Sequence, residues 1–318
     1  MTARGATRGL RATAGALGVA LAAACASPRA PAVVEGAARF DDASWDDGLA
    51  VVSVFRGRIR RYGVWRAAEV RDYLVREYLD PGDLTKRDRP VGGEVPVVKA
   101  NRLLSFETGT YGYRLMGSFF FHRGSGSLLR ARGSCQNACG LVTQSWDAFS
   151  GRLRSDSYWE REGRSETSLA VGDDWRFADE LPFVAAAIPR GARLRVVAPM
   201  AAPRSIVRPA PPEPVEAGGI GIGDLCEECV APSDGLPPSG EAVPTTVAAR
   251  SLSVEREGRT TRLVADDGTV EAEFLVDPNG FLESWTVRDE QVFERVAIFR
   301  AAYWELTAES DRRRVTIR

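Results

Sequence analysis

Apolar and polar side chains alternate along much of the chain, which is the pattern of half-buried β-strands. Residues 110–122 show it most clearly, because large apolar side chains occupy odd positions and the even positions include several small or polar ones. The predicted apolar face consists of Tyr111, Tyr113, Leu115, Phe119 and Phe121. A register shift of one residue would expose the whole set, so we expect this face to be buried.

The C-terminal part of the chain has the pattern of an antiparallel meander. Three turn sequences divide residues 249–287 into short runs, and these turns are Glu257-Gly258, Asp267-Gly268 and Asp277-Pro278-Asn279-Gly280. Residues 269–276 alternate like residues 110–122. Further strands are predicted near 49–56, 60–66, 96–106, 127–135, 139–147, 151–161 and 191–198.

Helical patterns are few and short. Residues 178–187 predict a helix of one or two turns, because Pro182 limits its length. Residues 68–79 are ambiguous, since Val70, Leu74 and Tyr78 fall at helical spacing and propensity favours a helix. About a dozen strands exceed what a flat open sheet holds. The sequence therefore predicts a mainly β fold, with one large antiparallel, twisted sheet that curls into a half-barrel or a sandwich.

The N-terminal residues have the features of a bacterial lipoprotein signal peptide. Arg4, Arg8 and Arg11 precede an apolar stretch at 12–24 that is too short to span a bilayer. Small residues at 22–24 come directly before Cys25, so we expect residues 1–24 to be removed and Cys25 to carry lipid. Such a lipid anchor binds membranes through roughly 0.8 kcal/mol per buried CH₂ group.

The residues after Cys25 predict the location and the domain organisation. Ala26 follows the anchor rather than Asp, which by the enteric sorting rule predicts the outer membrane, on the side that faces the periplasm. Residues 25–44 are predicted to be a flexible tether, and residues 45–318 a single β domain. Residues 199–245 are dense in Pro, Gly and Ala, and they predict a surface insertion in that domain.

Charge excludes one class of partner. The 318-residue chain has a net charge of −1, and loss of the three signal-peptide arginines leaves −4. Lys86 and Lys99 are the only lysines, and the many arginines alternate with acidic residues. This distribution does not form a basic patch for DNA or RNA, so no nucleic-acid partner is expected.

Four cysteines follow Cys25, and their spacing leaves three chemistries open. They form two close pairs, Cys135 with Cys139 and Cys226 with Cys229. An oxidising compartment favours two local disulfides, four thiolates could instead hold zinc, and the thiols could also remain reduced. A three-residue turn at 136–138 would bring the Cα atoms of Cys135 and Cys139 within disulfide range.

Other candidate chemistry is sparse. His122 is the only histidine, and it ends a predicted strand without a nucleophile motif nearby. The acidic doublets fall in predicted loops and are interpreted as solvated side chains. We therefore expect no catalytic residue, no metal site and no cofactor.

Several short motifs resemble one family of exported, β-rich bacterial proteins, many of which carry the label "septum formation inhibitor Maf". The motifs are Arg61-Tyr62-Gly63, Val95-Pro96-Val97-Val98-Lys99-x-Asn101, Thr108-Gly109-Thr110-Tyr111-x-Tyr113, Gln136-x-x-Cys139-Gly140 and Ala302-Tyr303-Trp304. The resemblance implies a strand at 68–79. This chain departs from the family at Asn137-Ala138, where Glu-Trp is usual, and in having the 199–245 insertion. The label itself does not suit this chain, because the ordered region lacks the motifs of the Maf pyrophosphatases.

These observations favour a non-enzymatic envelope lipoprotein that binds an apolar ligand or an envelope protein on the concave face of its sheet. The aromatic lining of residues 110–122 supports this hypothesis. One alternative is a surface-attached hydrolase that acts on glycans through paired carboxylates. The other is a purely structural envelope protein, whose concave face would be filled.

Overall fold

The computed structural model describes residues 38–88, 90–158, 163–169, 175–197 and 249–305. The predicted signal peptide, Cys25, the insertion at 199–245, Cys226 and Cys229 lie outside these residues. No helix in the described ranges is long and apolar enough to cross a membrane.

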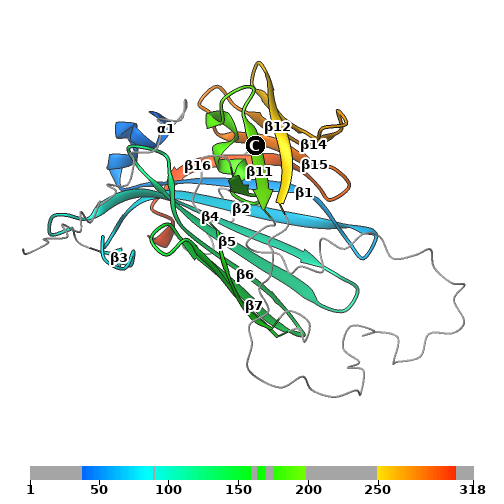
Figure 1. Ribbon diagram of the computed structural model, residues 1–318, viewed down its shortest axis with the longest axis horizontal. Helices are drawn as coiled ribbons and strands as arrows, with labels where there is room; N and C mark the ends of the chain where they lie inside the picture. Colours follow the sequence, from blue (N-terminus) through cyan, green and yellow to red (C-terminus); the bar gives the residue numbers. More distant parts are fainter. Residues whose placement is uncertain (1–37, 89, 159–162, 170–174, 198–248, 306–318) are drawn as a thin grey trace, which may run out of the picture. The chain divides into compact units, whose positions relative to one another are not determined.

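The described chain is built mainly from strands (Figure 1). The strands are β1 (Ala50–Arg61), β2 (Val64–Leu79), β3 (Lys86–Arg87), β4 (Val95–Glu107), β5 (Gly112–His122), β6 (Leu128–Asn137), β7 (Gly140–Asp147), β8 (Arg152–Ser157), β9 (Arg164–Ser168), β10 (Trp175–Phe177), β11 (Arg193–Val197), β12 (Ala249–Glu257), β13 (Thr260–Val264), β14 (Val270–Val276), β15 (Leu282–Val287) and β16 (Gln291–Ala301). The short helical segments are α1 (Ala38–Asp41), η1 (Ala43–Asp47), α2 (Leu181–Val184), η2 (Ala185–Ala187) and η5 (Tyr303–Glu305).

All these strands belong to one 16-stranded sheet with the order β10-β11-β12-β13-β14-β15-β16-β1-β2-β4-β5-β6-β7-β8-β9, and β3 pairs with β2. Neighbouring strands are antiparallel except for the parallel pair β10 and β11. The last strand, β16, pairs with the first, β1, and so joins the C-terminal meander to the N-terminal hairpins. The predicted mainly β class with one large sheet and few short helices is confirmed.

The sheet curls so that strands from opposite edges of the sheet order come into contact. β10 begins the sheet order and β7 lies near the opposite end, yet Trp146 of β7 packs edge-on against Trp175 and Phe177 of β10. The ring centroids are 5.3 and 6.1 Å apart, whereas a flat sheet would separate the same strands by roughly 58 Å. Aromatic side chains therefore join β7 to β10, two strands that no backbone hydrogen bond joins among the described residues. In Figure 1, β4–β7 fan out below β1 and β2, and β11, β12, β14 and β15 lie above them.

The first hairpin differs from the sequence prediction in its boundaries. Arg61 and Val64 form the last pair between β1 and β2, so Tyr62 and Gly63 make a two-residue turn. Both turn residues have positive φ, 53° and 72°, as a type I′ turn requires. β2 continues to Leu79, so the ambiguous segment at 68–79 is a strand rather than a helix. Its alternating burial, which follows the pairing to β1 and β4, outweighs its helical propensity.

A short N-terminal segment covers the end of the sheet where β5 finishes. Phe40 of α1 stacks on Phe121 with ring centroids 5.3 Å apart, and Trp45 of η1 is buried. Arg123 holds this segment, because its guanidinium donates to Asp46 and to the carbonyl oxygens of Phe40 and Asp42. The ordered domain thus includes residues that the sequence assigned to the tether, which was expected to extend to residue 44.

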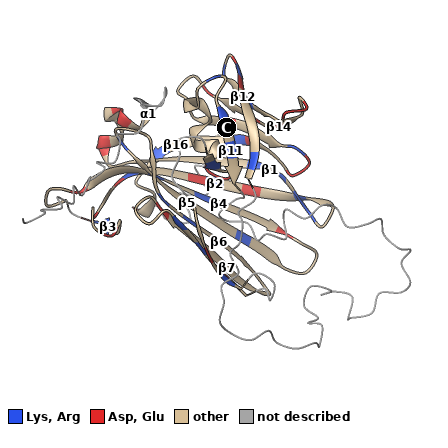
Figure 2. Ribbon diagram, viewed as in Figure 1, with Lys and Arg blue, Asp and Glu red and all other residues tan. Residues whose placement is uncertain are grey.

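Charges of both signs are interspersed along the strands (Figure 2). Many of them pair across neighbouring strands, as Arg262 does with Glu273 at 2.7 Å and Arg154 with Glu166 at 2.7 Å. These pairs are largely exposed, so water and salt screen them and they contribute little to stability. The fold rests on its apolar core and its hydrogen-bond ladder.

Candidate functional site: the concave face and its two ends

The predicted apolar face of β5 lies on the concave side of the sheet. Tyr113, Leu115, Phe119 and Phe121 are buried members of the main core cluster, and Tyr111 packs against that cluster half-buried. Gly117 interrupts this row of large side chains. A Cβ atom there would lie 3.0 Å from the Phe119 ring and 3.4 Å from Asp179 Oδ2, so glycine lets the loop before α2 approach the sheet.

The α2 and η2 segments fill the concavity that faces β5. Phe183 of α2 lies 6.0 Å from Phe119, measured between ring centroids. Arg256 of β12 fixes the segment from the opposite side, because its guanidinium donates to the carbonyl oxygens of Ala185, Ala186 and Ile188. Such bonds satisfy carbonyl groups that a helix end leaves without partners. The concave face in this region is a packed core.

A buried ion pair crosses the same face. Arg102 of β4 donates to Asp72 of β2 through two hydrogen bonds of 2.8 and 2.6 Å, and the two residues are directly opposite in the strand register. The Arg102 guanidinium also lies 4.9 Å from the ring centroid of Phe183 and 4.5 Å from that of Trp285. Burial raises the pKa of Asp72, and Arg102 opposes the rise. The sequence did not lead us to predict this pair. Its sign in the sequence is a charged residue at a position of each strand where alternation predicts a buried apolar one.

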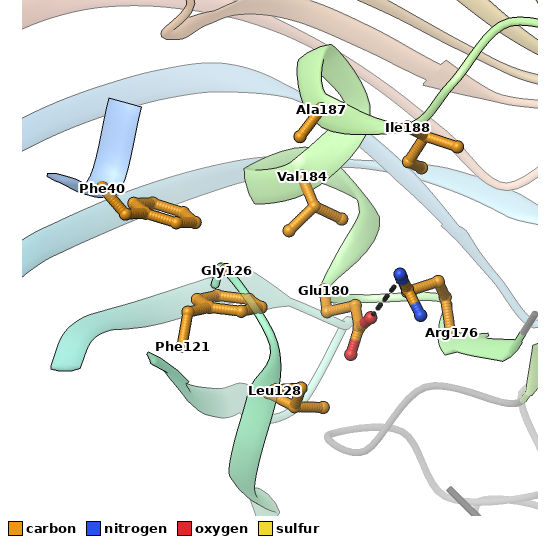
Figure 3. Close-up of a pocket in the computed structure, with 9 residues that line it drawn as sticks. All are labelled: Phe40, Phe121, Gly126, Leu128, Arg176, Glu180, Val184, Ala187 and Ile188. Atoms are coloured by element: carbon orange, nitrogen blue, oxygen red, sulfur yellow. Dashed lines mark ion pairs between the residues drawn. The ribbon is translucent and has the colours of Figure 1, made fainter. Parts of the chain in front are cut away.

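A small pocket adjoins α2, and Glu180 forms part of its wall (Figure 3). One Glu180 oxygen lies 3.3 Å from Arg176 Nε, and the other, Oε2, has no hydrogen-bond partner among the described residues. The rest of the lining is mostly apolar and includes Phe40, Phe121, Leu128, Val184 and Ile188. The pocket holds about 30 Å³, which is room for about two water molecules. Burial raises the pKa of Glu180 to about 8, against the opposing charge of Arg176.

Glu180→Gln is expected to change how stability depends on pH. The pKa of Glu180 rises on folding from 4.5 to about 8, so the folded state keeps a proton that the unfolded state releases. The contribution of this bound proton to the free energy of unfolding is fully present below about pH 4.5 and is lost as the pH rises through about 8. Between these values the wild type should lose up to about 1.4 kcal/mol per pH unit relative to the variant. Urea denaturation across this pH range measures the difference.

Glu166→Gln is the matched control for this experiment. Glu166 is exposed, and its hydrogen bond with Arg154 lowers its pKa, so its loss should not alter the slope above pH 5. Stability curves of wild type and Glu180→Gln that run parallel from pH 5 to 8 would show that Glu180 does not bind a proton in this range.

The expected disulfide between Cys135 and Cys139 is not present in the structure, and no other disulfide occurs among the described residues. The β6–β7 turn is shorter than predicted, because Asn137 pairs with Gly140 and only Ala138 and Cys139 form the loop. Cys135 is buried in the core opposite Val142, whereas Cys139 lies in the turn. Cys226 and Cys229 lie outside the described residues.

His122 has a local structural role at the end of β5. Its Nδ1 accepts a hydrogen bond of 3.1 Å from the Ser125 backbone N–H and lies 3.0 Å from Ser125 Oγ. These contacts fix the turn that leads into β6. Among the described residues, no group of three or more histidine, cysteine or acidic side chains could hold a metal ion.

Three tyrosines cluster around one arginine at the end of the sheet where β5 begins, opposite to the end that carries His122. Tyr62 from the β1–β2 turn and Tyr113 of β5 bring their hydroxyl oxygens within 2.8 Å, and Tyr111 Oη lies 3.5 Å from Tyr113 Oη. Arg61 Nη2 donates to Tyr62 at 3.1 Å and to Tyr113 at 3.4 Å. We call Arg61, Tyr62, Tyr111 and Tyr113 the rim cluster.

The β6–β7 turn lies close to this cluster. Tyr158 donates a hydrogen bond of 3.3 Å to Asn137 Oδ1, and its ring packs on Gly140, where a Cβ atom would lie 2.6 Å away. Burial raises the pKa of Tyr158, and the neighbouring Cys139 and Tyr113 raise it further. Three of the motifs that carry the family resemblance therefore meet at this end of the sheet. Sequence spacing gave no sign of it, because the turns are far apart along the chain.

Comparisons with known proteins give little further guidance. No family model matches the chain, and no curated protein matches it. The crystal structure of a β-barrel-like protein of DUF1849, a domain of unknown function, from Brucella abortus is similar with a TM-score of 0.38 and 9% sequence identity. The match covers 80% of this chain and 98% of that chain.

Proposed function

We propose that the protein is a non-enzymatic lipoprotein of the cell envelope, whose β domain binds an envelope partner on its surface. The observation that carries this proposal is the filled concave face. Aromatic side chains, the Arg102–Asp72 pair and the α2–η2 segment occupy it, and the pocket beside them holds about 30 Å³. A drug-sized ligand needs a pocket of roughly 300–1,000 Å³. An apolar ligand of that size therefore does not fit beside α2, which favours a partner protein, or a purely structural role, over a ligand carrier.

The first test is the lipid anchor. Cys25→Ser should leave the chain unprocessed or soluble, because it removes the thiol that follows the basic and apolar segments and would carry the lipid. Membrane fractionation and mass spectrometry of the N-terminus measure the effect. Ala26→Ser is a neighbouring control that keeps Cys25 and should keep the outer-membrane location. A Cys25→Ser chain that is cleaved normally and stays with the membranes contradicts the anchor.

The second test concerns the filled concave face. Native mass spectrometry of the purified full chain should show its own mass and the anchor lipid without a further bound lipid. Palmitate added to the chain in neutral detergent should not change its melting temperature, because the concavity offers no room. A saturable rise in the melting temperature with palmitate would favour a ligand carrier and overturn this part of the proposal.

A further inference from the structure

The rim cluster is rich in hydrogen-bond donors and poor in acceptors. Arg61 has five N–H donors and no acceptor, and each tyrosine hydroxyl adds one donor. The acceptors within the cluster are only the three hydroxyl oxygens, which already receive the Arg61 bonds and bond to one another. Arg61 Nε is buried and has no hydrogen-bond partner among the described residues. The missing component is an acceptor.

The charge of Arg61 is also uncompensated within the cluster. Arg61 is only 4% exposed, and the partners of its guanidinium among the described residues are tyrosines rather than carboxylates. The tyrosines do not supply the negative charge, because burial raises the pKa of Tyr62 to about 12 and also raises the pKa of Tyr111. At neutral pH these hydroxyls are therefore protonated and serve as donors.

Arg102, the other arginine that is buried among the described residues, has an acidic partner, and so does the half-buried Arg295. Arg102 binds Asp72 with two hydrogen bonds, and Arg295 lies 2.9 Å from Asp277. A buried cation without such a partner is costly, since its desolvation is not balanced by an opposite charge. Arg61 at the rim thus lacks the carboxylate partner that Arg102 has in the interior.

The β1–β2 turn places the Tyr62 ring on the Arg61 guanidinium. The φ of Tyr62, 53°, is the one that the type I′ turn requires. The ring centroid lies 4.2 Å from Arg61 Cζ, and 49% of Tyr62 is exposed. A ligand would therefore reach Arg61 by displacing this one half-exposed side chain.

We propose that Arg61, Tyr62, Tyr111 and Tyr113 form a binding site for an oxyanion, the phosphate or carboxylate group of a ligand. The planar guanidinium matches the geometry of both groups, and the tyrosine hydroxyls add donors to the same oxygens. The site lies at the start of β5, away from the pocket beside α2, so this inference goes beyond the proposed function and does not depend on it.

The direct test is a titration of the full chain in neutral detergent. The Arg61 Nε–H signal in a ¹H–¹⁵N spectrum should shift and saturate with sodium phosphate, with sodium acetate, or with dioctanoyl phosphatidylglycerol, at constant ionic strength set with chloride. Saturation by inorganic phosphate or acetate alone identifies a free anion. Saturation by the phospholipid at lower concentration than by phosphate identifies a lipid headgroup. No saturable shift with any of the three overturns the proposal.

Matched variants separate the site from general electrostatics. Arg61→Gln should weaken binding about tenfold or more, because it removes the charged donor, and Tyr62→Phe should weaken it about threefold or more without loss of the ring. Calorimetry with the tightest of the three ligands measures both. Arg58→Gln removes an equal charge from an exposed position of β1 and should change affinity less than twofold. The proposal is wrong if Tyr62→Phe binds like wild type, or if Arg58→Gln and Arg61→Gln lose affinity equally. Tyr62→Phe removes only the hydroxyl of a half-exposed side chain and keeps the test valid if Arg61→Gln does not fold.

Discussion

Arg102→Leu should lower the free energy of unfolding by about 3–5 kcal/mol, because it leaves a buried carboxylate without its charge partner. Asp72 is nearly fully buried, and Arg102 donates both of its strong hydrogen bonds. The variant also removes a guanidinium that lies between Phe183 and Trp285. Urea denaturation at pH 7 measures the loss. Since burial already raises the pKa of Asp72, the carboxyl of the variant should take up a proton on folding.

Two further variants test this explanation. Asp72→Leu combined with Arg102→Leu removes both charges and should recover much of the stability, because a buried pair can be replaced by apolar groups at little net cost. Arg164→Leu breaks the exposed pair with Asp156 at 3.1 Å and should cost less than about 1 kcal/mol. A double variant that is no more stable than Arg102→Leu alone would show that packing of the guanidinium, rather than charge pairing, dominates.

The sequence pattern predicted strands wherever one face of the strand is buried and the other exposed. β5 and the meander β12–β15 fall in this class. β16 was missed because a bulge interrupts its alternation. Phe293 and Phe299 are six residues apart and would share a face in a regular strand. Instead Phe293 lies in the main core opposite Gly57, and Phe299 pairs with Val52 in a separate cluster on the other face.

The candidate sites could not be predicted because they depend on register between distant segments. Asp72 and Arg102 are 30 residues apart, and only the pairing of β2 with β4 sets them opposite each other. Arg61 and Tyr113 are 52 residues apart and meet because the β1–β2 turn and the start of β5 reach the same end of the sheet. The disulfide prediction depended on turn length, and one residue fewer in the β6–β7 loop placed Cys135 and Cys139 differently. Residue types suggested the chemistry, and the register determined which groups meet.

The large apolar side chains of β5 provide the sharpest measure of whether the concave face is a core or a ligand cavity. Phe119→Ala should lower the free energy of unfolding by about 3–5 kcal/mol, because the truncated side chain leaves a cavity that its neighbours fill only in part. Phe119 is 0% exposed and packs against Phe121 and Phe183 with ring centroids 6.4 and 6.0 Å away. Chemical denaturation with urea gives the value.

Phe149→Ala supplies the control, since it removes the same side chain from a position that is 61% exposed and should change stability by less than about 0.5 kcal/mol. A lined but open cavity would behave differently from a packed core. Phe119→Ala would then cost little, and an added apolar ligand would raise the stability of the wild type. A loss near 4 kcal/mol that palmitate does not alter would instead establish that the aromatic face of β5 stabilises the curled sheet, and would leave partner binding to the surface of the domain.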